Sequence, residues 1–172
     1  MLIIATGQIP TPRAAHASCC VNFNQLVVYG GATGSGGLAT DDLFLLDLKV
    51  EQNAEWIIVP VKGTTPGRRY GHTLVYLKPY LILCGGNYAN EPANDVWIFN
   101  SESQPLQWNK LDIMSDLPPC RVYHTAAVCN YGFATGMMVI FGGRKKDGVV
   151  LNDMWGLRKH RNGVWDWVFF YF

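Results

Sequence analysis

The sequence predicts an all-β protein of the propeller type: three four-stranded antiparallel blades and a remnant of one more strand, forming an incomplete ring. Three observations predict it. An Arg-x-x-His motif, a glycine pair that closes an apolar run, and an Asp followed by an apolar and an aromatic residue each occur three times, always in this order. The units recur about every fifty residues, a period typical of propeller blades with several short strands each.

The repeated residues define the predicted structural positions of each blade. The entrance motifs are Arg13 with His16, Arg69 with His72, and Arg121 with His124. The glycine pairs are Gly30-Gly31, Gly85-Gly86 and Gly142-Gly143, and the aspartates are Asp42, Asp95 and Asp153. The aromatic residues are Phe44, Trp97 and Trp155, and the closing tryptophans are Trp56, Trp108 and either Trp165 or Trp167.

The second unit shows the predicted elements most clearly. Residues 71–76 form a short apolar-leaning strand, and residues 80–84 form a nearly continuous apolar strand, as expected where both faces are covered. The glycine pair ends that strand, the polar residues 87–94 form a loop, and residues 95–100 and 107–111 form the third and fourth strands. A four-stranded meander with two apolar faces needs a neighbouring blade on each side.

Alignment of the units predicts their bounds. Blade 1 covers residues 12–60, blade 2 residues 66–112 and blade 3 residues 119–172, with residues 167–172 as its last strand. Residues 1–7 align with the end of a strand whose blade is otherwise missing. We therefore expect three blades and a remnant cut from a longer protein. Closed propellers have about four to eight blades, so the terminal blades are expected to associate with the rest of the ring or with a second copy.

Composition excludes several classes of protein. The chain is 49% hydrophobic and 13% aromatic, too apolar for a disordered segment. Its formal charge of +1 argues against a nucleic-acid partner, and no apolar run is long enough for a membrane span. The five cysteines are an odd number without a C-x-x-C pair, which favours a reduced chain in the cytoplasm, with the nucleus as an alternative.

The repeated polar residues are expected to be structural, because a residue repeated in every blade is first a packing residue. We expect His16, His72 and His124 to form hydrogen bonds in the blade cores, against the alternative of a metal or acid–base role. The three arginines either bond neighbouring carbonyls and aspartates or line a channel mouth that binds acidic ligands. The three aspartates are expected to cap turns before the third strands.

Partner binding is expected on the loops that do not repeat, because rigid scaffolds carry function there. These are residues 32–40, 87–94 and 144–150. Aromatic and charged residues favour protein recognition, so the candidate partner-binding residues are Asn87, Tyr88, Arg144, Lys145 and Lys146. No catalytic, cofactor-binding or metal-binding residue is predicted in the chain.

The glycine pairs, following aromatics and closing tryptophans together resemble kelch repeats over essentially the whole chain. The sequences that connect and surround these motifs resemble a narrower group of proteins. The strings PTPRAAH, GRRYGH, LQWNKL, LPPCRVYHTA and, most specifically, GLRKHRNGVWDW resemble the amino-terminal kelch region of the Ser/Thr protein phosphatases with kelch-like domains, found in plants and apicomplexan parasites.

That resemblance implies a parent enzyme with a phosphoprotein phosphatase domain that uses two metal ions. The metal-binding strings GDxHG, GDxVDRG and GNHE do not occur in these 172 residues, so no catalytic residue is transferred. The resemblance implies that the chain recruits substrates or regulators to the phosphatase. Two alternatives stay open: a kelch scaffold of a cytoskeletal or trafficking protein without a phosphatase, and a metal-binding kelch enzyme.

Overall fold

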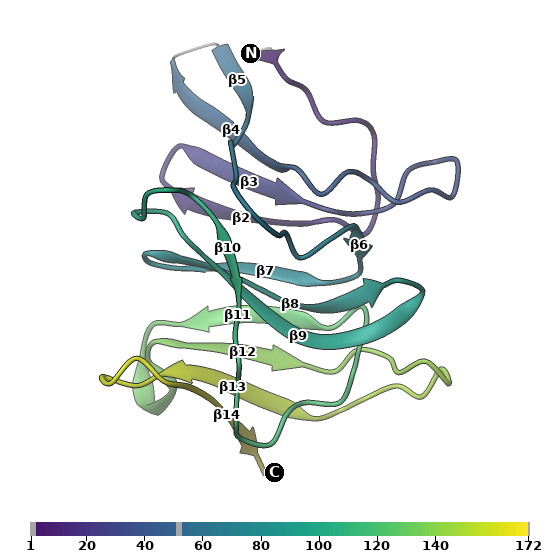
Figure 1. The fold of residues 1–172 in the computed structure, drawn as a ribbon, viewed down its shortest axis with the longest axis vertical. Coiled ribbons are helices and arrows are strands. Elements are labelled where there is room, and N and C mark those ends of the chain that lie inside the picture. The colour runs from purple at the N-terminus through teal and green to yellow at the C-terminus, as the bar shows by residue number, and fades with distance from the viewer. Residues whose placement is uncertain (1–2, 51–52, 172) are drawn as a thin grey trace.

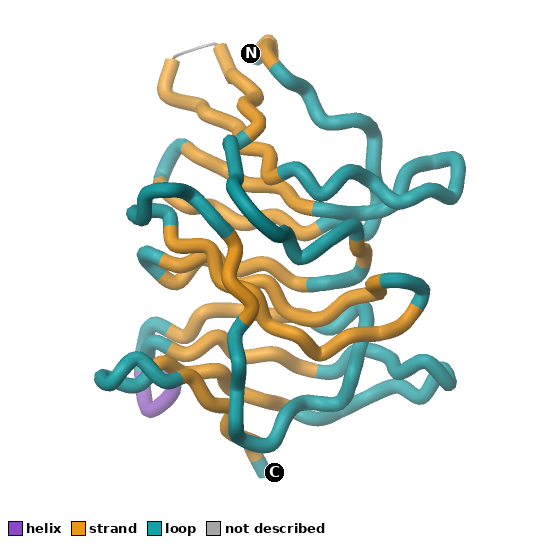
Figure 2. Tube along the Cα trace, in the orientation of Figure 1, coloured by secondary structure: helices purple, strands orange, loops and turns teal. Residues whose placement is uncertain are grey.

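The computed structural model describes residues 3–50 and 53–171, and its secondary structure is almost entirely strand and loop (Figure 2). The all-β class predicted from the sequence is confirmed. Within the described residues the only helix is a single 3-10 turn, Gly132–Ala134. No helix in this described part is long and apolar enough to cross a bilayer.

Blade 1 is an antiparallel meander of four strands, β2 (Ala17–Asn22), β3 (Gln25–Tyr29), β4 (Leu43–Val50) and β5 (Asn53–Ile58). A further strand, β1 (Ile4–Gly7), runs parallel to β5 along its outer edge. The predicted amino-terminal strand therefore exists, but it pairs with the first blade and not with strands of a preceding one. Met1 and Leu2 lie outside the described residues.

The position of β1 is that of a connection between blades. Gly7 stands in the same place as Gly63 relative to the entrance arginine, and Thr6 pairs in parallel with Glu55. Lys62 in the connection to blade 2 forms the equivalent parallel bridge to Gln107. Each connection thus lies against the outer strand of the blade that it enters, which covers an edge that would otherwise be open to pairing.

Blade 2 contains β7 (Thr73–Leu77), β8 (Tyr80–Tyr88), β9 (Glu91–Asn100) and β10 (Trp108–Lys110), with the short β6 (Arg69–Tyr70) paired to the far end of β8. The predicted loop at residues 87–94 is wrong. The two strands continue through it as a long hairpin, with only Ala89 and Asn90 in the turn. The glycine pair interrupts the register of β8 but does not end the strand.

Blade 3 contains β11 (Thr125–Cys129), β12 (Met137–Phe141), β13 (Met154–Lys159) and β14 (Trp165–Phe170). Its last strand begins two residues earlier than predicted. The closing tryptophan is Trp167, because it pairs with Leu157 as Trp108 pairs with Phe99 in blade 2.

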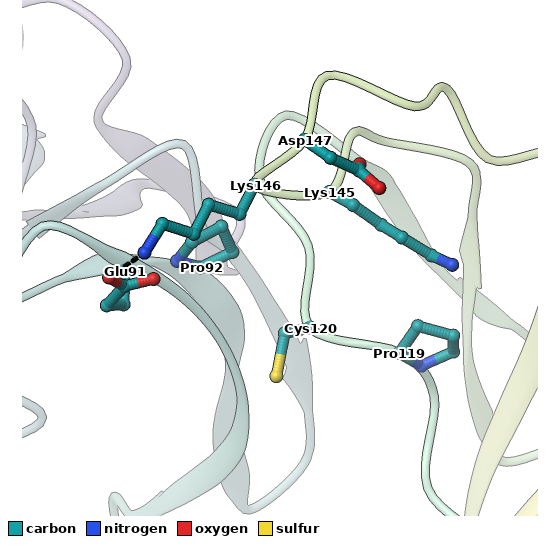
Figure 3. A pocket seen from close by; sticks show the side chains of 7 residues that line it. All are labelled: Glu91, Pro92, Pro119, Cys120, Lys145, Lys146 and Asp147. Atoms are coloured by element: carbon teal, nitrogen blue, oxygen red, sulfur yellow. Dashed lines mark hydrogen bonds and ion pairs between the residues drawn. The ribbon is translucent and has the colours of Figure 1, made fainter.

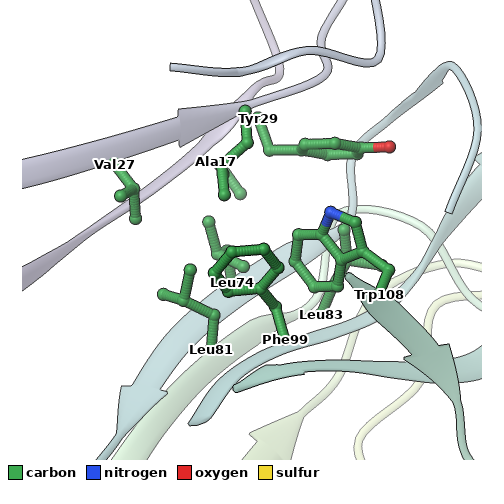
Figure 4. Close-up of a cluster of buried hydrophobic side chains, with 9 residues drawn as sticks. Ala17, Val27, Tyr29, Leu74, Leu81, Leu83, Phe99 and Trp108 are labelled. Carbon is green, nitrogen blue, oxygen red and sulfur yellow. The ribbon is translucent and has the colours of Figure 1, made fainter. Parts of the chain in front are cut away.

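The three blades stack one on the next along the long axis of the molecule (Figure 1), and in the described part of the chain they form an open arc. The inner strands follow each other, since β2 contacts β7 and β7 contacts β11. One apolar core fills the gap between blades 1 and 2, where Tyr29 and Trp108 meet at 5.6 Å between ring centroids (Figure 4). A second core, around Ile82, Met138 and Trp167, fills the gap between blades 2 and 3.

Candidate functional site

The entrance motifs of blades 2 and 3 each build a buried ion pair. Arg69 is 1% exposed and donates to both carboxylate oxygens of Asp95, at 2.8 and 3.0 Å, and to the carbonyl of Gly85 at 2.8 Å. Arg121 repeats this with Asp153, at 2.7 Å to each oxygen. The arginines thus take the first of their two predicted roles and join the entrance of a blade to its third strand.

Asp95 and Asp153 bond to side chains, whereas the sequence predicted that they cap turns. Besides accepting from arginine, Asp95 accepts a hydrogen bond from the indole nitrogen of Trp97 at 2.7 Å, and Asp153 does so from Trp155. Burial would raise the pKa of Asp95, but the hydrogen bonds and charge of Arg69 outweigh it and leave that pKa lowered. The aspartate therefore connects the repeated arginine to the repeated tryptophan.

Blade 1 has a looser version of this arrangement. Arg13 is half-buried, donates to the carbonyls of Thr11 and Gly30 at 3.1 Å, and lies 4.9 Å from the ring centroid of Phe44. Phe44 stands where the other blades have tryptophan and has no indole N–H to donate to an aspartate.

The histidines mark the contacts between blades. His124 is buried, and its Nε2 lies 2.9 Å from the hydroxyl of Thr73 in blade 2. His72 is buried with its ring edge-on to Tyr29 of blade 1, at 5.8 Å. Burial, reinforced by nearby arginines, lowers the pKa of His72 to about 3 and that of His124 to about 4. His16, in the first of the three described blades, is exposed.

The segments that follow the glycine pairs, which are residues 32–40, the tip of the β8–β9 hairpin and residues 144–150, lie on one side of the blades, on the right of Figure 1. There the tip of the β8–β9 hairpin, the entrance to blade 3 and the 144–150 loop surround an open hollow of about 790 Å³ (Figure 3). Its walls mix charged side chains, two prolines and a thiol. The lining residues are Glu91, Pro92, Pro119, Cys120, Lys145, Lys146 and Asp147.

The predicted partner-binding residues lie on this side, but not all in the hollow. Lys145 and Lys146 line it, and Lys146 forms an ion pair with Glu91 that joins blades 3 and 2. Tyr88 lies on the hairpin over the guanidinium of Arg69, 5.2 Å from its ring centroid. Arg144 lies over the ring of Tyr123 at 5.6 Å. Asn87 is half-buried within β8.

The sequence analysis missed the residues that the entrance to blade 3 supplies. Pro119 and Cys120 precede Arg121 in the connecting segment, and Tyr123 is 53% exposed beside Arg144. They lie inside or next to the repeat, whereas the binding residues predicted from the sequence lie in loops outside it. The sequence does distinguish Tyr123, because it stands where the other blades have the small residues Ala15 and Gly71.

Within residues 3–50 and 53–171, no group of three or more His, Cys, Asp and Glu side chains is placed to hold a metal ion. The three repeated histidines lie in separate blades.

The fold defines a propeller built from kelch-like blades, and comparison with known proteins places it in a family. The model of the KLHDC2/KLHL20/DRC7 Kelch-repeats domain matches residues 2–168. The chain belongs to the kelch-repeat family.

Two curated relatives and one solved structure illustrate the likeness. Serine/threonine-protein phosphatase BSL2 of Arabidopsis thaliana is 39% identical over 162 residues, which cover 94% of this chain and 15% of that protein. An F-box/kelch-repeat protein of the same plant is 35% identical over 175 residues, covering 95% of this chain and 34% of the relative. The structure of YjhT superimposes with a TM-score of 0.67 at 18% identity, covering 94% of this chain and 46% of that one, which supports the fold alone.

Proposed function

We propose that this chain is a protein-interaction module that uses its loop side to bind a protein partner, and that it recruits substrates or regulators to a linked Ser/Thr phosphatase domain. The observation that carries the first part is the hollow between blades 2 and 3, flanked by exposed tyrosines and cationic side chains. Tyr88 is 48% and Tyr123 53% exposed, and each lies beside an arginine. Tyrosine and arginine are the residues that most often anchor protein interfaces.

The binding proposal is tested with a peptide library displayed on phage and selected on the purified chain. Peptides enriched on the wild type should lose binding to Tyr88→Ala and to Lys145→Glu. Matched controls are Tyr131→Ala and Lys78→Glu, which change exposed residues in the turns between β11 and β12 and between β7 and β8. Absence of enrichment, or equal loss of binding in the controls, contradicts the proposal.

The link to a phosphatase is supported by the 39% identity to BSL2 over 94% of this chain. This chain spans 15% of that relative, so the activity belongs to the proposed parent protein. The parent would hold two metal ions in its phosphatase domain. The test is the coding sequence of the full gene: the strings GDxHG, GDxVDRG and GNHE downstream of the kelch region support the proposal, and a different downstream domain contradicts it.

The alternative is a kelch scaffold of a cytoskeletal or trafficking protein without a phosphatase. The F-box/kelch-repeat relative supports this alternative, because its name combines kelch repeats with an F-box and not with a phosphatase. The same gene sequence separates the two.

We also propose a cytoplasmic location, with the nucleus as an alternative, which imaging of a fluorescent fusion would test. A third proposal is self-association through the terminal blades.

A further inference from the structure

The third residue of the entrance motif has the same left-handed backbone conformation in every blade. Its φ is 53° at Ala15, 64° at Gly71 and 59° at Tyr123. The amide of Gly71 donates to the carbonyl of Ala15, and the amide of Tyr123 donates to the carbonyl of Gly71, each at 2.8 Å. Because this contact between blades uses the backbone in a left-handed conformation, the position favours glycine or another small residue.

Tyr123 departs from that preference. A bulky residue at positive φ is a backbone outlier, and such outliers are concentrated at functional sites. The side chain is 53% exposed, so full burial of the ring does not compensate for the unfavourable backbone. Ala15 and Gly71 show that a blade entrance forms without a large side chain at this position. The fold therefore does not require the tyrosine, which indicates that its ring serves binding.

Two further large residues that depart from the repeat meet the ring of Tyr123. Tyr70 stands where the other blades have alanine and valine, and its ring centroid lies 6.0 Å from that of Tyr123. Arg144 stands where the other blades have alanine and asparagine, and its guanidinium lies 5.6 Å from the ring centroid of Tyr123. We call Tyr70, Tyr123 and Arg144 the aromatic platform. A packing role common to all blades does not explain it, because its residues do not repeat.

The aromatic platform is built by contacts between blades 2 and 3. A Cβ added to Gly71 would lie 3.0 Å from two ring atoms of Tyr123, so the glycine of blade 2 makes room for the ring from blade 3. Tyr70, the residue before that glycine, flanks the same ring. The ring of Tyr123 thus rests on blade 2, and the platform does not depend on the outer faces of blades 1 and 3.

The aromatic platform and the hollow lie along the same two segments of the chain. On the entrance segment of blade 3, Cys120 lines the hollow and Tyr123 belongs to the platform. In the loop that follows the glycine pair, Arg144 belongs to the platform and Lys145 lines the hollow (Figure 3). Three residues of chain span at most about 10 Å, so an extended peptide of a few residues is long enough to contact both.

The combined surface has a surplus of positive charge. Among residues 3–50 and 53–171, Arg144 and Lys145 form no ion pair, whereas Lys146 is paired with Glu91. With Asp147 included, three cations stand against two carboxylates. The surplus of one positive charge matches a single carboxylate. A guanidinium stacked on a tyrosine ring keeps its N–H groups available to both oxygens of such a carboxylate.

We propose that this surface binds an extended acidic peptide of a partner protein; the inference rests on the interaction function proposed above and names the chemistry of its partner. Arg144 binds the carboxylate of one Asp or Glu side chain of the peptide. The rings of Tyr70 and Tyr123 contact the residue beside it, and the peptide continues into the hollow past Lys145. The partner is acidic because the surface carries one positive charge more than its own carboxylates neutralise.

Fluorescence anisotropy with synthetic peptides tests the proposal on the whole 172-residue chain. The probes are the peptides enriched in the phage selection, each made in three forms: as selected, with its Asp or Glu replaced by Asn or Gln, and with phosphoserine at that position. The selected peptides should share an acidic residue. The amide form should bind at least about tenfold more weakly, because Arg144 loses its charged partner. The phosphoserine form should bind no more tightly than the selected one.

Variants of the chain separate binding from packing. Tyr123→Gly and Arg144→Gln should each weaken binding of the selected peptides at least about tenfold. Tyr123→Gly should not lower the melting temperature, because glycine adopts positive φ without strain. Arg144→Lys should bind less well than the wild type, because an ammonium does not bind both carboxylate oxygens as a guanidinium does. Tyr131→Ala and Lys78→Gln, at the opposite ends of the strands, are the controls and should bind normally.

Four results would each overturn the acidic-peptide proposal and leave the interaction module standing. They are enriched peptides without an acidic residue, an amide form that binds as well as the acid, a phosphoserine form that binds about tenfold more tightly, and a Tyr123→Gly variant that is less stable but binds normally. A selection that enriches no peptide contradicts both proposals.

Discussion

The buried arginines are stable only because each has a complete set of partners. Arg69 and Arg121 are 1% exposed, and their aspartates are 15% and 16% exposed. Moving a charge out of water costs several kcal/mol, which the pair offsets only with good geometry and further hydrogen bonds. Each arginine forms two hydrogen bonds to its aspartate and a further one to a glycine carbonyl, so both requirements are met. The main effect of the ion pair is to hold the entrance of the blade in one position.

Replacing Arg69 by Met should lower the free energy of unfolding by about 3–5 kcal/mol, because Asp95 would lose its partner. Arg68→Met changes the neighbouring exposed arginine and should stay within about 0.5 kcal/mol of the wild type. Chemical denaturation monitored by tryptophan fluorescence measures both. Equal effects of the two variants would show that the ion pair does not hold the blade.

The buried histidines make the fold sensitive to acid. Their pKa values in the folded chain, about 3 for His72 and about 4 for His124, lie below the ordinary value of 6.5. Between these values and 6.5 the unfolded chain binds more protons, so stability falls as the pH is lowered through that window and is fully present above it. Each histidine contributes at most about 1.4 kcal/mol per pH unit.

Denaturation midpoints recorded from pH 7 to pH 4 test this expectation. Replacing His124 by Gln should flatten the dependence on pH. A stability that does not vary over this window would contradict the neutral, buried state of the two rings.

At the scale of single elements, the glycine pairs are the features that the sequence predicted only in part. The sequence predicted that the glycine pair of blade 2 ends the second strand of that blade. The strand instead continues past the pair, because the register shift at Cys84 to Gly86 absorbs the irregular backbone. The polar residues 87–94 predicted a loop, but cross-strand pairing with the hairpin partner overrode their low strand propensity.

Two glycines with nearly the same φ differ in the space around them, so comparing them distinguishes backbone strain from steric clash. Gly86 has φ of +87° and Gly148 has φ of +86°. A Cβ on Gly86 would lie 2.6 Å from the Cβ of His72, whereas one on Gly148 meets nothing within 4 Å. Gly86→Ala should therefore destabilise the chain by about 1–3 kcal/mol more than Gly148→Ala. Thermal unfolding of the two variants measures the difference, and equal melting temperatures would argue against the close packing of His72.

At the scale of the whole molecule, the order of blades and the repeated structural residues could be predicted because every unit repeats the same motifs. The candidate binding side could be predicted only as a set of loops. The hollow depends on Pro119 and Cys120 at the entrance to blade 3 meeting Glu91 on the hairpin of blade 2 and Lys146 in the blade 3 loop. These contacts between blades depend on how adjacent sheets stack, which a repeat pattern within one blade does not specify.

Kelch blades are joined through repeated backbone contacts at their entrances, and these contacts should hold the loop side in one position. Native-state hydrogen exchange tests it most directly. The amides of Gly31, Gly71, Gly86 and Tyr123, which donate across the blade contacts, should exchange only at rates close to those of global unfolding. Exchange of these amides as fast as that of the exposed Gly34, in the 32–40 loop, would contradict the account.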